Sequence, residues 1–273
     1  MNQTFSFQRW SLLVAKHWAE NRKRYLLSLA AMAGLMFMWF VFIMMTDKQD
    51  PMAKGLQQVT YFFPLFAVGA FYSSQFFKDM HSRTKGVNYL LVPASALEKL
   101  LCALFYGLVL FFVVFTLLFY IVDVLAVAAG NILHPYYGGS GAGVNKATVA
   151  NVFDLDTEQN VGYYFILFFV AVQASALLGS AYFSNYHFIK TAIVFCLLAL
   201  FIFVLESAVL NHLLPRGGFN QNMHTYRFFT DDNKSWQITL ASWIGDSFSV
   251  LFKYAFPPLF WVVTYYRLKE KEV

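Results

Sequence analysis

Residues that could do chemistry are few in this chain, and they are scattered. The sequence has no His-Glu-x-x-His, Cys-x-x-Cys or Gly-x-Ser-x-Gly pattern and no Walker nucleotide-binding motif. Its six histidines fall in different segments, whereas a metal site would need several of them to converge. We therefore predict that the chain is not an enzyme and that it binds no metal or cofactor itself.

Charged residues in or beside apolar runs are the remaining candidates, because burying charge in lipid is costly. Asp123, Glu206, Asp246 and Lys253 all lie toward the end of a run that we place at the outer surface. Glu206 and Lys253 should share a similar depth, so we consider an ion pair between them. The alternative is that Lys253 extends to the interface and Glu206 is hydrated. No acidic residue is expected at mid-membrane, which counts against a proton-driven carrier.

The stretch 85–100, "KGVNYLLVPASALEKL", interrupts the apolar sequence in a specific way. Pro93 disfavours helix in the preceding residues and favours an extended Val92. Ser95 followed by Glu98 before an apolar run is a capping box, so a helix should begin at Ser95. An apolar patch, Tyr-Leu-Leu-Val, precedes it in a loop rich in Lys and Arg. Such a patch is typical of a partner surface or a membrane-surface contact.

The order of residues in and around this loop carries a resemblance. An aromatic residue and Lys-Asp are followed by Thr-Lys-Gly, Leu-Leu, Pro, Ser and Leu-Glu-Lys; the matching positions are Phe77, Asp79, Thr84, Gly86, Leu90, Leu91, Pro93, Ser95, Glu98 and Lys99. This pattern resembles the first cytoplasmic loop of the membrane subunits of type 2 ATP-binding-cassette exporters. Ala96 departs from it, because the family often has a basic residue there.

The resemblance implies that residues 77–94 form a coupling loop that docks on a separate ATPase subunit. We expect that surface to include Asp79, Gly86, Tyr89, Leu90, Leu91, Pro93, Ser95, Glu98 and Lys99. The resemblance also implies a pair of permease subunits, often a homodimer, with ATP and Mg²⁺ bound on the partner ATPase. The ending "VVTYYRLKEKEV" is similar to small bacterial permeases, which implies the bacterial inner membrane.

The elements that must position this loop follow from composition. Of the 273 residues, 59% are hydrophobic and only 13% are charged, which indicates an all-α polytopic membrane protein. We predict a single transmembrane domain over 1–273. Its six spans are expected at about 25–45, 56–76, 95–122, 161–183, 191–210 and 248–266. The outer segment 211–246 could hold a short re-entrant helix near 238–244.

Charge sets the expected orientation. The net charge is +5, and Lys and Arg gather in the N-terminal segment, in 77–94, in 185–190 and after residue 266. This flanking distribution is topogenic and does not indicate nucleic-acid binding, so both termini should be cytoplasmic. Phe7, Trp10, Val14 and Trp18 share one helix face, which predicts an amphipathic interfacial helix over 5–20. A soluble helix packed on the loops is the alternative.

These observations favour the membrane-spanning permease subunit of an ATP-driven exporter. Hydrolysis must then occur in a separate subunit, because the chain has no nucleotide-binding fold. The alternatives are a membrane scaffold or sensor subunit whose loop binds another partner, and a secondary transporter or channel.

Overall fold

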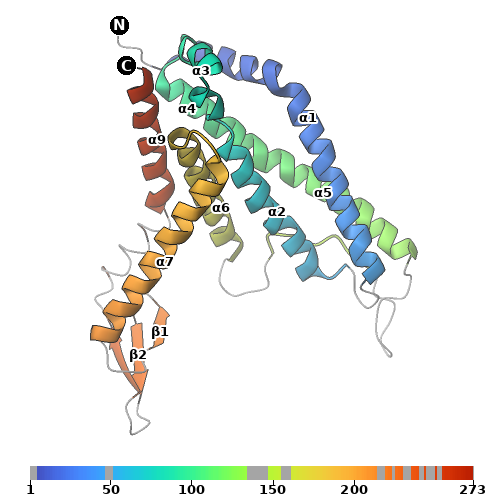
Figure 1. Ribbon diagram of the computed structural model, residues 1–273. Helices are drawn as coiled ribbons and strands as arrows, with labels where there is room; N and C mark the ends of the chain where they lie inside the picture. The colour runs from blue at the N-terminus through green and yellow to red at the C-terminus, as the bar shows by residue number, and fades with distance from the viewer. Residues whose placement is uncertain are drawn as a thin grey trace.

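The computed structural model describes residues 5–46, 52–133, 147–154, 161–213, 219–222, 225–229, 235–239, 243, 250 and 254–272. The protein is predominantly helical, as predicted (Figure 1). The long helices are α1 Phe7–Thr46, α2 Lys54–Ser74, α5 Phe111–Leu133, α6 Val161–Tyr182, α7 His187–Leu213 and α9 Phe256–Glu272. Shorter elements are the 3-10 helix η1 Lys78–His81, the helices α3 Arg83–Leu90 and α4 Ala96–Leu104, and the π-helical turn η2 Phe105–Leu110.

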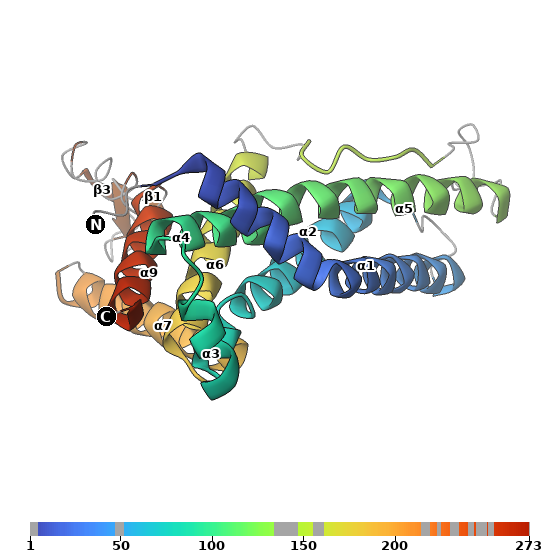
Figure 2. The same cartoon turned by 90° about the horizontal axis from the view of Figure 1, so that it is seen from above.

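The helices pack so that one end of the bundle collects segments far apart in the sequence. There the start of α1 lies beside α4, and α4 packs on α9 (Figures 1 and 2). We call this the loop end. Farther along, α1 lies beside α5, while α6 contacts α2, α7 and α9. The loop between α2 and α4 is therefore held by the first and last helices of the chain.

Four helical segments in the described part of the chain are long and apolar enough to cross a membrane. They are Phe7–Thr46, Ala96–Leu133, Gly162–Tyr182 and His187–Leu205. This supports membrane association. The predicted span 56–76 corresponds to α2, which carries the buried polar side chains Gln57, Thr60 and Ser73. Within the predicted span 248–266, α9 begins at Phe256.

The N-terminal region differs from the prediction in one boundary. An interfacial helix over 5–20 was predicted ahead of the first span, but α1 is one continuous helix from Phe7 to Thr46 that changes direction along its length (Figures 1 and 2). The physical reason is that residues 19–25, "AENRKRY", contain no proline or glycine to end a helix. The interfacial position of its first part stays a prediction.

A small antiparallel sheet between α7 and α9 was not predicted. Strand β2, Thr225–Phe229, pairs with β1, Phe219–Asn222, and with β3, Ser235–Thr239. Ile238 and Thr239, where a re-entrant helix was expected, belong to β3. Strand β3 reads "SWQIT", and its Trp, Ile and Thr favour strand over helix.

Two buried clusters hold the helices together. The loop-end core consists of Phe77, Met80, Ala96, Leu100, Ala103, Leu177, Ala181 and Leu268. The central core is built mainly from aromatic and methionine side chains of α1, α2, α5 and α6, among them Phe40, Tyr61, Phe115, Phe119 and Phe169. The loop-end core thus fastens η1 and α4 to α6 and α9.

One long helix joins the two cores. From Ala96 to Leu133 the backbone stays helical, with the π-helical turn η2 between α4 and α5. In this turn the Tyr106 hydroxyl donates to the Val14 carbonyl of α1 at 2.9 Å. The Ser73 hydroxyl of α2 donates to the Gly107 carbonyl at 3.4 Å. The turn therefore touches two neighbouring helices at once.

Candidate partner-docking site

The start of α4 is built by the predicted capping box. The Ser95 hydroxyl accepts from the Glu98 N–H at 3.2 Å, and the Glu98 carboxylate accepts from the Ser95 N–H at 2.9 Å. The box satisfies two backbone donors that a helix start leaves without partners. The prediction that a helix begins at Ser95 is confirmed, with Ser95 as the N-cap residue. Upstream, α3 ends at Leu90, three residues before Pro93.

The Glu98 carboxylate also contacts the start of α1, which the sequence did not reveal. Its other carboxylate oxygen accepts from the Ser6 N–H at 2.8 Å and pairs with the Arg9 guanidinium at 3.0 Å. The carboxylate is fully buried and receives three hydrogen bonds, from the Ser6 N–H, the Arg9 guanidinium and the Ser95 N–H. We call Ser6, Arg9, Ser95 and Glu98 the Glu98 junction. It ties the start of α1 to the start of α4.

Four of the predicted surface residues are buried: Gly86, Ser95, Glu98 and Lys99. The last three lie at the start of α4 and support the loop from inside the protein. The Lys99 ammonium lies 5.3 Å from the centroid of the Tyr89 ring, a cation–π contact. Tyr89 itself is half-buried against the loop-end core.

Gly86 is required by a close approach of backbone. A Cβ atom at this position would lie 2.8 Å from the Met80 carbonyl oxygen. The Gly86 N–H donates to the Ser82 carbonyl at 2.8 Å, and Ser82 in turn donates to the Asp79 carbonyl. Asp79 is half-buried in η1. These contacts fold η1 tightly against α3, so a larger residue at position 86 would push them apart.

The exposed part of the loop is smaller than predicted. Val87, Asn88, Leu91 and Pro93 are exposed, and the Leu91 side chain is 74% exposed. Asn88, Leu91 and Pro93 form part of one wall of an open groove whose other wall is α1. We call this the docking groove; it is lined by Arg9, Leu12, Leu13, Lys16, Glu20, Asn88, Leu91, Val92, Pro93 and Ala94. The side chains of Thr84 and Leu90 lie outside the described residues.

A second polar contact fastens the other side of the loop. The Lys271 ammonium of α9 lies 2.9 Å from Nε2 of His81 in η1, where it can donate to a neutral ring. Burial and the neighbouring Lys271 charge lower the pKa of His81. Burial and the charge of Arg267 lower the pKa of Lys271. The end of α9 is thereby joined to the loop.

Another buried carboxylate, Asp123, lies in α5. It is fully buried, and neither of its oxygens meets a hydrogen-bond partner among the residues that the structure describes. Its neighbours along the helix, Val122 and Ala126, belong to the central core.

The predicted Glu206–Lys253 ion pair stays a prediction, because Lys253 and the Glu206 side chain lie outside the described residues.

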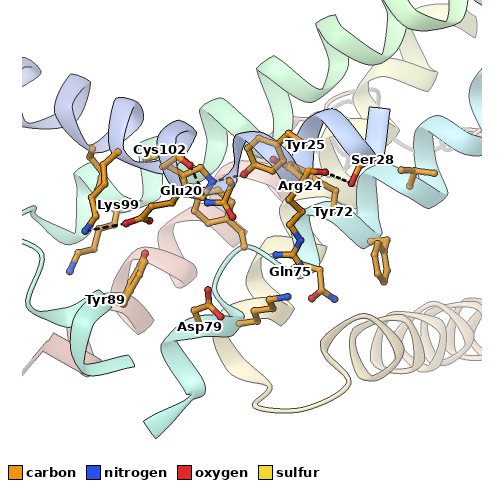
Figure 3. A pocket seen from close by; sticks show the side chains of 18 of the residues that line it. Glu20, Arg24, Tyr25, Ser28, Tyr72, Gln75, Asp79, Tyr89, Lys99 and Cys102 are labelled. Atoms are coloured by element: carbon orange, nitrogen blue, oxygen red, sulfur yellow. Dashed lines mark hydrogen bonds and ion pairs between the residues drawn. The ribbon is translucent and has the colours of Figure 1, made fainter. Parts of the chain in front are cut away.

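A second cleft, which the sequence did not indicate, lies beside the docking groove. It has a volume of about 430 Å³ and runs between α1 and α2, with η1, Tyr89 and Lys99 at one end (Figure 3). Charged side chains line that end, and apolar side chains line the rest. We call it the α1–α2 cleft.

No family model, no curated protein and no solved structure matches this chain. The exporter hypothesis therefore depends on the loop residues and on the helical membrane architecture alone.

Proposed function

We propose that this protein is the membrane-spanning permease subunit of an ATP-driven exporter in the bacterial inner membrane, and that a separate ATPase subunit binds in the docking groove. The observation that carries the proposal is the exposed Leu91 on a loop whose base is fixed by the buried Glu98 junction. An exposed apolar side chain on a rigid support, in a groove that combines apolar and charged residues, is typical of a protein-binding surface.

The connections of the loop suggest how a push on it would spread. Force on α3 would reach α1 through the Glu98 junction, because Ser6 and Arg9 are bonded to Glu98. It would reach α5 directly, since α4 and α5 are parts of one long helix. Through His81 and Lys271 it would reach α9. Closure of a docked ATPase could thus tilt the first, third and last predicted spans together.

The working unit in this proposal contains two permease subunits and two ATPases, with both termini of each permease in the cytoplasm. The six predicted spans belong to the same proposal; α2 and α9 would supply the two spans beyond the four apolar segments already identified. ATP and Mg²⁺ would bind the partner only.

The test is co-purification from the native host. Wild-type protein with a gentle affinity tag should bring down an ATPase subunit, and Leu91→Asp should lose it because a charge would face the partner's apolar surface. Tyr186→Asp is the matched control. Tyr186 is also 74% exposed, sits in the turn between α6 and α7, and has a φ of 55°, which Asp tolerates.

Each outcome is informative. Loss of the ATPase with Leu91→Asp and retention with Tyr186→Asp would support the proposal. Absence of any ATPase from the wild-type preparation would contradict it. Capture of a different protein through Leu91 would favour the scaffold or sensor alternative.

A proton-coupled carrier is the second candidate, and Asp123 is the observation that favours it. A buried carboxylate without a partner, inside an apolar helix, is the kind of residue that proton-driven carriers use. Transport in vesicles separates the two. An exporter needs ATP and its partner, whereas a carrier works from a proton gradient and fails with Asp123→Asn.

A further inference from the structure

We infer that the α1–α2 cleft binds an anionic amphiphile from the membrane, with its phosphate or carboxylate headgroup at the loop end and its hydrocarbon between α1 and α2. This inference concerns a ligand site that adjoins the docking groove and shares Leu13, Lys16, Glu20 and Val92 with it. It does not depend on the ATPase partner.

The charged end of the cleft carries an excess of positive side chains. Four basic residues line it against two acidic ones; they are Lys16, Arg24, Lys78 and Lys99 against Glu20 and Asp79. Lys16 lies 3.8 Å from Glu20, so part of this charge is balanced within α1. Arg24 extends from α1 toward Gln75 at the end of α2 (Figure 3). A guanidinium beside an amide offers several donors to an anionic oxygen.

The apolar part of the cleft continues in one direction on both walls. On α1 the lining changes from Arg24 to Ala31, Met32 and Leu35, from about 10 to about 16 Å farther along the helix axis. On α2 it changes from Gln75 to Phe71 and Val68. Both helices therefore turn from polar to apolar at the same level, as a headgroup and its chain would require.

Aromatic side chains lie at the boundary between the charged and the apolar part of the α1–α2 cleft. The Tyr25 ring lies 5.7 Å from the Tyr72 ring, and the His17 ring stacks on Phe76 at 4.9 Å. Tyrosine rings are favoured where one side is apolar and the other is hydrated. In this inference, these rings mark the level of the membrane surface inside the cleft.

Size and position identify the class of ligand. A volume of about 430 Å³ lies within the range of small-molecule sites. The apolar half lies on Phe7–Thr46, which is long and apolar enough to span a membrane, so the cleft is positioned to be filled from the bilayer. Basic clefts between membrane helices near the surface are known to bind anionic lipid headgroups. A soluble anion would use only the charged end.

Binding can be measured with defined probes. The purified full-length protein in neutral detergent is titrated with phosphatidylglycerol, with phosphatidylcholine and with inorganic phosphate, and occupancy is read by native mass spectrometry. We expect phosphatidylglycerol to bind more tightly than phosphatidylcholine. Arg24→Gln should weaken that binding about five-fold, while Arg24→Lys should retain most of it.

Matched controls sit on the same helix. Arg22 is exposed but does not line the cleft, so Arg22→Gln should leave binding unchanged. Ala31→Trp should block the apolar half, whereas Leu27→Trp, at an exposed position outside the cleft, should not. Variants are compared only if their thermal unfolding midpoint equals that of the wild type.

Three results would overturn the inference. One is equal binding of the two lipids. Another is an equal effect of Arg24→Gln and Arg22→Gln. The third is tight binding of inorganic phosphate alone, because it would assign the cleft to a soluble anion. None of these results bears on whether an ATPase occupies the docking groove.

Discussion

Glu98 and Asp123 lie on one continuous helix and are both fully buried, yet their surroundings are opposite. The Glu98 carboxylate receives three hydrogen bonds from the starts of α1 and α4, one of which is also its ion pair with Arg9. Asp123 meets no hydrogen-bond partner among the described residues. The buried carboxylate of Glu98 joins the starts of two helices through its hydrogen bonds. The buried side chain of Asp123 makes no such connection among the described residues, so nothing there offsets the cost of its burial.

Removing the carboxylate of Glu98 should give the largest effect. Glu98→Ala leaves the Arg9 guanidinium and the N–H groups of Ser6 and Ser95 without their acceptor. We expect the free energy of unfolding to fall by about 3 kcal/mol, the lower end of the cost of breaking a buried ion pair. Thermal or denaturant unfolding in detergent measures it.

Glu20→Ala is the matched control for Glu98. Glu20 pairs with Lys16 on the exposed surface of α1 at 3.8 Å, so its loss should cost less than about 1 kcal/mol. Equal destabilisation by the two variants would refute the structural role assigned to the Glu98 junction.

Gly86→Ala tests the packing of the loop end without touching charge. The added methyl group would lie 2.8 Å from the Met80 carbonyl oxygen, so η1 and α3 must move apart. A loss of about 1–3 kcal/mol is expected from such overpacking. At Gly34 in α1 a Cβ meets nothing within 4 Å, and Gly34→Ala should stabilise the helix. If both variants behave alike in thermal unfolding, the close approach at Gly86 is not present in solution.

Asp123→Leu should raise the free energy of unfolding, whereas Glu98→Ala should lower it. Replacing a buried carboxylate that has no partner by an apolar side chain of similar size removes its desolvation cost. The free energy of unfolding should rise by about 1 kcal/mol, near the lower end of the penalty for an unsatisfied buried polar group. A loss of stability on this replacement would mean that Asp123 has a partner, and the contrast with Glu98 would disappear.

The smallest effect is expected from pH at the His81–Lys271 contact. The pKa of His81 lies below 6.5 in the folded protein, so the unfolded chain binds more protons as the pH falls below 6.5. Stability from this group is therefore complete above pH 6.5 and decreases below it. His81→Gln should flatten that part of the unfolding profile, and an unchanged slope would remove His81 from the contacts that hold α9.

Local signals in the sequence were sufficient for some features and not for others. The capping box at Ser95 was predictable because both of its partners lie within three residues. The reach of Glu98 to Ser6 and Arg9 was not, since 92 and 89 positions separate them along the chain. Tyr-Leu-Leu-Val looked like one exposed patch, but α3 turns Tyr89 inward and Leu91 outward.

The long helix shows the same limit in another way. Its apolar composition predicted a span beginning at Ser95, and a helix is found there. Nothing in "FYGLVL" distinguishes a π-helical turn from ordinary helix, because the turn depends on the contacts of Tyr106 and Gly107 with α1 and α2. The α1–α2 cleft was missed for a related reason: its walls come from two helices, and only their packing brings the two polar-to-apolar transitions level.

The π-helical turn also affects which side of the helix the residues before and after it face. Ala103 of the loop-end core and Phe115 of the central core are 12 positions apart, a third of a turn out of step in a regular α-helix. A π-helical turn absorbs one extra residue, which leaves about three whole turns and brings both side chains to one side of the helix. The helix therefore contains one residue more than a regular α-helix would need to align the two cores, and the π-helical turn at 105–110 accommodates it. Deleting the exposed Val109 should convert the turn to α-helix while both cores stay in register.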